Sequence, residues 1–243
     1  MKIGLLNAYI CDPDPKSYQY TYAPMFRQFF SEHISTTWIL TEYRITQDKW
    51  PKTIDECDGW IICGSPKSVY DEDDWIAKLI TFAKNCHQHK KPLVGICFGH
   101  QLIAQALGGE VNKSDKGWGV GVRNFDMLGY KPWMPEAKKE CRLLFSHQDQ
   151  VETLPPSAEL LASDPFCPHQ IFTIDEHILS IQGHPEFTTT YMRDRLESRR
   201  TVIGENRYQA ACATLTKPTD SALFGSWIHA FFASAISKHH SAI

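Results

Sequence analysis

Residues 92–109 read PLVGICFGHQLIAQALGG, and this stretch determines how the rest of the chain is interpreted. Residues 93–96 form a short apolar run that predicts a buried strand, and the pattern turns helical directly after Cys97. Glycine stands two residues before the cysteine and two residues after it. A sharp turn from strand to helix needs small residues on both sides, as in the Gly-x-Ser-x-Gly elbow of hydrolases. The stretch therefore predicts a strand-to-helix turn with Cys97 at its tip.

Strand and helix patterns alternate along the first half of the chain. The apolar runs that predict strands cover residues 2–9, 37–43, 59–63 and 93–96. The helical patterns cover residues 23–33, 71–86 and 98–107. Alternating strands and helices joined by short loops are typical of a doubly wound, mostly parallel sheet with flanking helices. We therefore expect an α/β fold of the flavodoxin-like type.

The second half departs from this alternation. Strand patterns with few helices between them cover residues 110–125, 142–146, 159–162 and 170–181. We expect these strands to form a small antiparallel extension or edge hairpins on the main sheet. Two helical segments, 188–215 and 221–238, come last, and no repeat or linker interrupts the sequence. The sequence predicts one domain over residues 1–243, in which residues 188–243 are a helical C-terminal extension.

Composition and charge are those of a globular protein in a reducing compartment. Of the 243 residues 42% are hydrophobic and 22% are charged, and the formal net charge of −3 gives no reason to expect nucleic acid or a membrane as a partner. No run reaches the roughly 18 apolar residues of a membrane span. The opening MKIGLLNAYIC could be read as a signal peptide, but the DPDP at residues 12–15 favours a strand that ends in a turn. Eight cysteines without a secretory signal then indicate a cytoplasmic protein.

The predicted turn surrounds Cys97 with groups that suit a nucleophile. The N-terminus of a helix stabilises a thiolate, and its free backbone N–H groups can stabilise an oxyanion. A buried structural cysteine in an ordinary loop is the alternative interpretation. The turn alone leaves both open.

A histidine and a carboxylate far along the chain favour the nucleophile. The apolar run 178–182 predicts a strand, and GHPE follows it at residues 183–186. Active sites of α/β sheets lie at the C-terminal ends of strands, which is where His184 is expected. Glu186 is near enough in sequence to orient the imidazole and fix its tautomer. We therefore expect His184 to be the base that a Cys97 nucleophile requires.

Other roles for cysteine and histidine have less support in the sequence. His100 lies too close to Cys97 along the predicted helix to be its base, and we expect it to be packed or solvated. No C-x-x-C pair occurs, and CPH at residues 167–169 and HH at residues 239–240 stand alone, so no metal site is expected. The glycine-rich run 117–121 lacks the Lys-Ser/Thr of a phosphate loop. No nucleotide site and no cofactor are therefore expected.

Three separated motifs, GICFGHQ (95–101), SHQD (146–149) and GHPE (183–186), occur in this order. Together they resemble the class I glutamine amidotransferases, and the resemblance runs from about residue 58 to residue 187. GSPKSVY at residues 64–70 resembles the standalone members that are similar to the amidotransferase domain of GMP synthase. The resemblance implies the fold of that family and a catalytic triad of cysteine, histidine and glutamate.

The resemblance also implies the roles of individual residues. The triad would consist of a nucleophile, a base and an orienting carboxylate, here Cys97, His184 and Glu186. The oxyanion hole would use backbone N–H groups of Phe98 and of the Gly64-Ser65 turn. Ser65 stands where the family has a second glycine, and serine would be strained there if the position requires a positive φ.

The residues that hold the substrate follow from the same resemblance. Gln101 matches the residue that contacts the glutamine side of the substrate. Ser146, His147 and Asp149 match the segment that holds the α-amino and α-carboxylate groups, largely through backbone atoms.

The implied reaction is hydrolysis of the γ-glutamyl amide of glutamine to glutamate and ammonia through a cysteine thioester. Such an enzyme would pass the ammonia to a separate synthetase subunit, since the residues after Glu186 are too few for a synthetase module. A freestanding γ-glutamyl peptidase that acts on glutathione-like compounds is the alternative, because the same motifs occur in both groups. A pseudo-enzyme or binding module is a third reading, which the intact triad disfavours. An α/β-hydrolase would place its acid before the histidine in the chain, whereas here the acid follows it.

Overall fold

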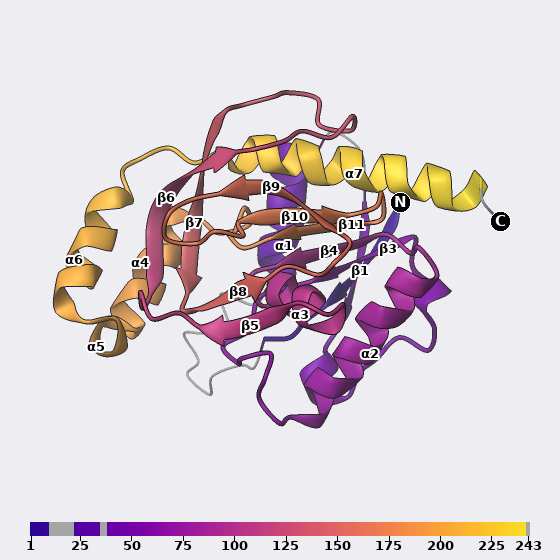
Figure 1. Cartoon of the computed structure of the whole chain (residues 1–243), viewed down its shortest axis with the longest axis horizontal. Helices are drawn as coiled ribbons and strands as arrows, with labels where there is room; N and C mark the ends of the chain where they lie inside the picture. The colour runs from indigo at the N-terminus through magenta and orange to yellow at the C-terminus, as the bar shows by residue number, and fades with distance from the viewer. Residues whose placement is uncertain (10–21, 35–37, 242–243) are drawn as a thin grey trace.

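The computed structural model of the chain describes residues 1–9, 22–34 and 38–241 (Figure 1). A nine-stranded sheet in the order β2-β1-β3-β4-β11-β10-β9-β6-β7 forms its centre, and a separate two-stranded sheet pairs β5 with β8. The expected α/β class is therefore confirmed. The turn predicted at residues 12–15 lies outside the described residues.

One half of the large sheet is parallel. Its strands are β2 (Ile39–Tyr43), β1 (Lys2–Leu6), β3 (Gly59–Ile62), β4 (Leu93–Ile96) and β11 (Ile178–Ile181). Every neighbouring pair among them runs in the same direction. All of them except the edge strand β2 are buried, and strands covered on both faces read as continuous apolar runs, which is why the sequence pattern located them within a few residues.

The other half of the sheet is antiparallel. Its strands are β10 (Ile171–Ile174), β9 (Ala158–Ser163), β6 (Gly119–Met127) and β7 (Glu140–His147), while β5 (Glu110–Lys113) and β8 (Asp149–Thr153) form the small second sheet. The expected continuous strand patterns 110–125 and 170–181 are each divided in two. The breaks coincide with backbone of positive φ, at Gly117 (77°) and Asp175 (48°). β7 ends and β8 begins within the SHQD motif, at His147 and Asp149.

Helices cover both faces of the parallel half (Figure 1). α1 (Tyr22–His33) and α7 (Ser221–Ser241) contact each other, and so do α2 (Asp74–Gln88) and α3 (Phe98–Ala106). A Cβ on Gly59 of β3 would lie 2.6 Å from the ring of Phe232 in α7. The next side chain along the strand, Trp60, meets Phe82 of α2 at 5.1 Å between ring centroids. Because successive strand side chains point to opposite faces, α7 and α2 lie on opposite sides of the sheet.

Three short helices flank the antiparallel half where residues 188–215 were expected to be helical. They are α4 (Thr189–Ser198), α5 (Arg200–Ile203) and α6 (Glu205–Thr214), and Gly204 at φ 85° separates the last two. α6 packs on β6, where a Cβ on Gly121 would lie 2.5 Å from Thr214 Oγ1. The glycine-rich run 117–121 therefore makes room for a helix.

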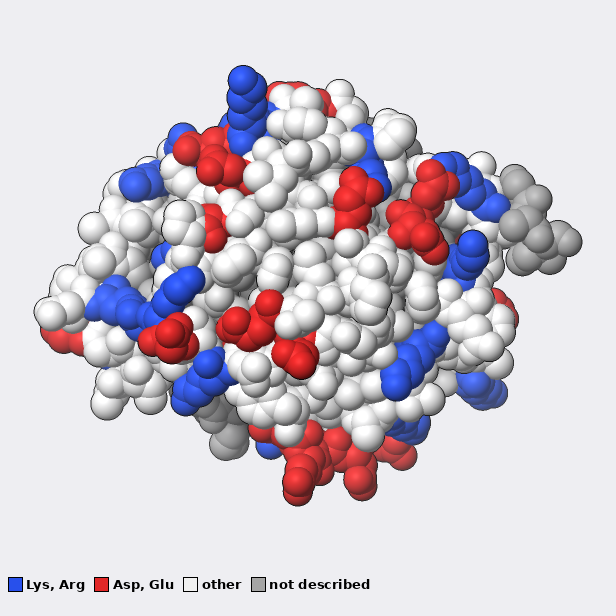
Figure 2. All heavy atoms as spheres, viewed as in Figure 1, with Lys and Arg blue, Asp and Glu red and all other residues white. Residues whose placement is uncertain are grey.

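The surface and the helices add two observations on partners. On the face shown in Figure 2, lysine and arginine are interspersed with aspartate and glutamate, and no broad basic patch forms. Within the described ranges, none of the helices has the length and hydropathy needed to cross a bilayer. The buried apolar side chains on both faces of the sheet belong to one cluster, which supports the proposal of a single domain.

Candidate active site

The turn between β4 and α3 holds Cys97 in an unusual backbone conformation, with φ 53° and ψ −102°. A Cβ on Gly99 would lie 2.2 Å from the carbonyl oxygen of Ile62, and one on Gly95 would lie 2.5 Å from the carbonyl oxygen of Gly99. Any side chain at either position would thus collide with backbone. The Cys97 N–H donates to the carbonyl of Ile181 in β11 at 2.9 Å. The turn is as predicted, and its two glycines are required by backbone crowding.

His184 and Glu186 lie just beyond the end of β11. The backbone N–H of His184 donates to the carbonyl of Leu144 in β7 at 2.8 Å, which fixes the segment to the neighbouring part of the sheet. Nδ1 of His184 donates to Oε1 of Glu186 at 2.7 Å, and both side chains are almost completely buried. The ring of Phe187 stacks on the imidazole at 3.7 Å between centroids and 8° between planes. The imidazole therefore has one defined orientation.

The charges around His184 favour its protonated form. Burial alone would lower the pKa of His184, but the negative charges of Glu186 and of a Cys97 thiolate outweigh it and raise this pKa to about 9. The Cys97 side chain also contributes through a hydrogen bond to the imidazole. The structure thus brings together the three residues that the sequence predicted as a triad.

The turn after β3 approaches the same histidine. A Cβ on Gly64 would lie 2.5 Å from the hydroxyl of Tyr22 and 3.0 Å from Cε1 of His184, so glycine allows this close approach. Ser65 is not among the residues with positive φ, and the strain considered for serine at this position is absent. Phe98 is the first residue of α3, and its N–H has no acceptor within the helix.

The residues predicted to hold the substrate surround one cavity of about 190 Å³ that Cys97 also lines. Gln101, Ser146, His147 and Asp149 all line it, together with Ser65. No site role was predicted for the remaining lining residues, which are Pro66, Lys67, Ser68, Tyr70, Lys113, Trp118, Gln148 and Arg199.

Asp149 is held at this cavity by neighbours on several elements. Its carboxylate accepts hydrogen bonds from the hydroxyls of Ser68 at 2.5 Å and Tyr70 at 3.0 Å. Its backbone carbonyl accepts one from Nε2 of Gln101 at 2.7 Å. Gln101 also donates to the side chain of Gln182 at 3.0 Å. The predicted pair Gln101 and Asp149 is therefore in direct contact.

His147 contributes to the cavity as a neutral side chain. Burial lowers the pKa of His147 to about 4, and its Nδ1 lies 3.0 Å from the carbonyl of Asp149. It cannot supply positive charge to a bound substrate at neutral pH. His100, expected to be packed or solvated, is fully buried and hydrogen-bonded to Ser180 at 2.8 Å.

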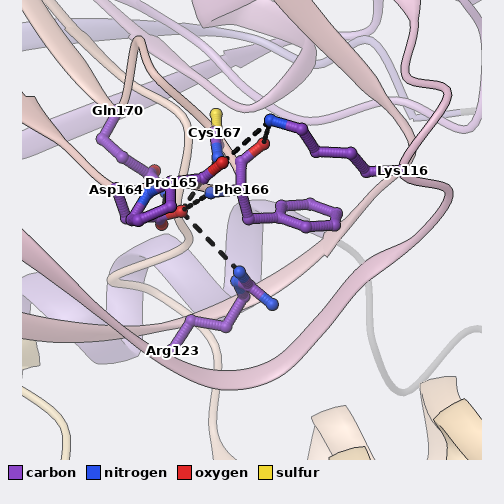
Figure 3. Close-up of polar contacts among 7 residues, drawn as sticks. All are labelled: Lys116, Arg123, Asp164, Pro165, Phe166, Cys167 and Gln170. Atoms are coloured by element: carbon purple, nitrogen blue, oxygen red, sulfur yellow. Dashed lines mark hydrogen bonds and ion pairs between the residues drawn. The ribbon is translucent and has the colours of Figure 1, made fainter.

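A tight loop at residues 164–167 is held by polar contacts with neighbouring residues (Figure 3), and its Phe166 ring contacts His147. Asp164 accepts hydrogen bonds from the backbone N–H groups of Phe166 and Cys167 at 2.6 and 2.9 Å, and Arg123 lies 3.7 Å from its carboxylate. The guanidinium of Arg123 also covers the ring of Phe166 at 4.1 Å. The Phe166 ring in turn lies 6.3 Å from that of His147. These residues support the ring of His147, and no sequence motif predicted the arrangement.

Two further residues of the cavity were missed, and they come from distant elements. Arg199 follows α4, and its Nη1 donates to the hydroxyl of Ser146 at 3.1 Å. Trp118 precedes β6 and lies under the Arg199 guanidinium at 5.0 Å. In sequence Arg199 is one member of an arginine pair in a polar helical stretch, so only the fold shows that it faces the cavity.

No group of three or more His, Cys, Asp or Glu side chains that could hold a metal ion occurs within the described residues.

The family model for class I glutamine amidotransferases matches residues 19–202, and the chain belongs to this family. Gamma-glutamyl peptidase 3 of Arabidopsis thaliana is 36% identical over 154 residues, which are 60% of this chain and 61% of that protein. A glutamine amidotransferase-like protein of Schizosaccharomyces pombe is 32% identical over 90% of this chain and 93% of its own length. GMP synthase of Dehalococcoides mccartyi is 27% identical over 70% of this chain and 35% of its own length.

A solved structure has the same fold. The glutamine amidotransferase of Thermotoga maritima superimposes with a TM-score of 0.76, and the match covers 95% of this chain and 97% of that one at 15% identity. The sequence-based assignments of family and of fold class are confirmed. The chain is accordingly a class I glutamine amidotransferase domain.

Proposed function

We propose that this protein hydrolyses γ-glutamyl amide bonds, with Cys97 as the nucleophile and His184 as its acid and base. Glu186 is the carboxylate that orients the imidazole. The proposal depends above all on one observation: a buried His184–Glu186 pair meets a cysteine held at a turn that only glycines permit. A structural cysteine requires neither the positive φ nor the histidine.

The reaction follows from these positions. The Cys97 thiolate attacks the γ-carbonyl carbon, and the protonated imidazole of His184 gives its proton to the departing amine as the C–N bond breaks. A water molecule then attacks the thioester after His184 takes one of its protons. Glutamate leaves, and Cys97 returns to the thiolate.

Two groups of residues would support this chemistry. Backbone N–H groups of Phe98, Gly64 and Ser65 would stabilise the negative charge on the γ-carbonyl oxygen. The amino acid part of the substrate would occupy the cavity beside Cys97, in contact with Gln101, Ser146, His147 and Asp149.

Glutamine is the simplest substrate of this kind, and its products are glutamate and ammonia. In that case we expect a separate synthetase subunit to consume the ammonia. γ-Glutamyl peptides are the second candidate. The name of the Arabidopsis relative favours them.

We further propose that the protein acts in the cytoplasm. All seven cysteines within the described residues are free thiols, as a reducing compartment would keep them.

Steady-state kinetics with glutamine and with glutathione test the proposal. We expect the wild-type protein to release glutamate from at least one of them, and Cys97→Ala to release none from either. A preference for glutamine supports the amidotransferase reaction, and a preference for glutathione supports the peptidase reaction. A wild-type protein that hydrolyses neither substrate would contradict the proposed function.

A further inference from the structure

Arg199 places a positive charge inside the cavity that Cys97 lines. It directly follows α4 and lines the cavity. One of its donors is occupied by the hydroxyl of Ser146 at 3.1 Å, and the indole of Trp118 lies 5.0 Å from the guanidinium carbon. A guanidinium has five N–H donors in a planar fork, so further donors remain for a ligand.

This arginine lacks the carboxylate partner that two nearby cationic side chains have. Arg200, the next residue, pairs with Glu197 and Glu205 outside the cavity. Lys67, which also lines the cavity, pairs with two aspartates. Within the described part of the chain, no acidic side chain forms an ion pair with Arg199.

The acidic residue that lines the cavity does not fill this role. The carboxylate of Asp149 accepts hydrogen bonds from Ser68 and Tyr70. His147, the nearby ring in the same cavity, is held neutral by burial. Burial likewise lowers the pKa of Arg199, to about 10, which leaves the guanidinium charged at neutral pH. A partly desolvated guanidinium without a negatively charged partner is unfavourable, and a bound anion would remove this cost.

Guanidinium and carboxylate form charge-assisted, often bidentate pairs. We propose that Arg199 binds a carboxylate of the γ-glutamyl substrate and thereby selects it. This inference rests on the proposed function. Trp118 and Ser146 hold the guanidinium in one orientation, so the pair forms with little ordering of the side chain.

Two carboxylates could supply this anion. Every γ-glutamyl compound carries an α-carboxylate on its glutamyl part. A γ-glutamyl peptide carries a second carboxylate on the amine that leaves. If Arg199 binds the α-carboxylate, it contributes to the binding of every γ-glutamyl substrate. If it binds the carboxylate on the leaving amine, it contributes to the binding of peptides alone.

Three substrates separate the two sources. L-Glutamine has only the α-carboxylate, γ-glutamylglycine has both, and γ-glutamylglycinamide lacks the carboxylate on the leaving side. The values of kcat and KM are measured for wild type, Arg199→Gln and Arg199→Lys on all three. Arg193→Gln is the matched control, because Arg193 is an exposed arginine of the same helix that does not line the cavity.

The expected loss of kcat/KM in Arg199→Gln is about 10- to 100-fold, the effect of losing a hydrogen-bonded charge pair. A loss confined to γ-glutamylglycine assigns the carboxylate on the leaving amine, and an equal loss on all three assigns the α-carboxylate. The loss should fall mainly on KM, and Arg199→Lys should recover part of it. A merely structural arginine would not produce this dependence on the substrate's carboxylates.

The inference is overturned if Arg199→Gln matches wild type on all three substrates, or if Arg193→Gln loses as much. Should Arg199→Gln fail to fold, Arg199→Lys provides the same comparison between γ-glutamylglycine and its amide. A wild-type protein that hydrolyses none of the three contradicts the proposed function itself, and the inference with it.

Discussion

The two sides of the active-site cavity are positioned by different kinds of interaction. On the catalytic side, the ends of the parallel strands β3, β4 and β11 present Gly64, Cys97 and His184, and close packing around the glycines at the first two turns fixes their backbone. On the other side, β6, β7, β8 and the end of α4 contribute residues held by side-chain hydrogen bonds, such as Tyr70 to Asp149. The catalytic side leaves no room for substitution at its glycines. The other side can change its side chains while the sheet stays the same, which suits a surface that sets specificity.

The largest effect is expected on the catalytic side. Replacement Cys97→Ala removes the nucleophile, and we expect kcat/KM to fall by about four orders of magnitude or more. The free energy of unfolding should not fall, because the positive φ at this turn is unfavourable for any residue with a side chain. Hydrolysis assays and urea unfolding check the two parts. Residual activity within tenfold of wild type would contradict a nucleophilic role.

Replacement Glu186→Gln should have the next largest effect. It keeps the shape but removes the charge that orients the imidazole, and we expect a loss of about 10²- to 10⁴-fold. The pH profile of kcat/KM should also change. The charge of Glu186, together with that of the Cys97 thiolate, raises the pKa of His184 to about 9, so the protonated imidazole is present below that pH and is lost above it. Without this charge the alkaline limb moves to lower pH. A variant with an unshifted alkaline limb would show that Glu186 does not set the pKa of His184.

Replacement Gly99→Ala tests backbone crowding directly. A Cβ there would lie 2.2 Å from the carbonyl oxygen of Ile62, so β3 and the start of α3 must move apart. We expect a loss of about 2–3 kcal/mol in the free energy of unfolding, together with most of the activity. Gly129→Ala is the matched control, because among the described residues a Cβ at Gly129 would approach only Leu161, at 3.4 Å, and its φ is not positive. Equal losses in the two variants would refute the crowding argument.

The smallest effect is expected on the other side of the cavity. Replacement Tyr70→Phe removes one hydrogen bond to the carboxylate of Asp149, while Ser68 keeps the other. We expect KM to rise by about 3- to 10-fold with kcat nearly unchanged. Tyr130→Phe, at an exposed tyrosine that does not line the cavity, should leave both constants alone. A fall in kcat of the same size as that of Glu186→Gln would erase the distinction between the two sides.

The difference between the two sides of the cavity also explains how much of the fold and of the site the sequence could predict. The strands around Cys97 and His184 are buried on both faces and read as apolar runs, and the glycines beside Cys97 mark the turn. Local patterns therefore located the parallel half of the sheet and the three residues that meet at its edge. The split of residues 170–181 into β10 and β11 was missed because both strands are buried and only Asp175, near their turn, has a positive φ.

The other side has no local signature of this kind. Arg199 meets Ser146 and Trp118 only because α4 passes over the antiparallel strands. The support that Asp164 and Arg123 give to Phe166 likewise joins residues from separate strands and loops. Polar residues in loops and on exposed helix faces follow no periodicity, so their convergence becomes visible only in three dimensions.

The central claim is that Cys97 is the thiol that attacks a γ-glutamyl carbonyl. The most direct measurement is the intact mass of the protein, with peptide mapping, after treatment with L-6-diazo-5-oxonorleucine, an electrophilic analogue of glutamine. The account predicts one adduct per chain, located on Cys97, blocked by excess glutamine or γ-glutamylglycine and absent from Cys97→Ala. No adduct, or an adduct on the half-buried Cys212 in place of Cys97, would contradict it.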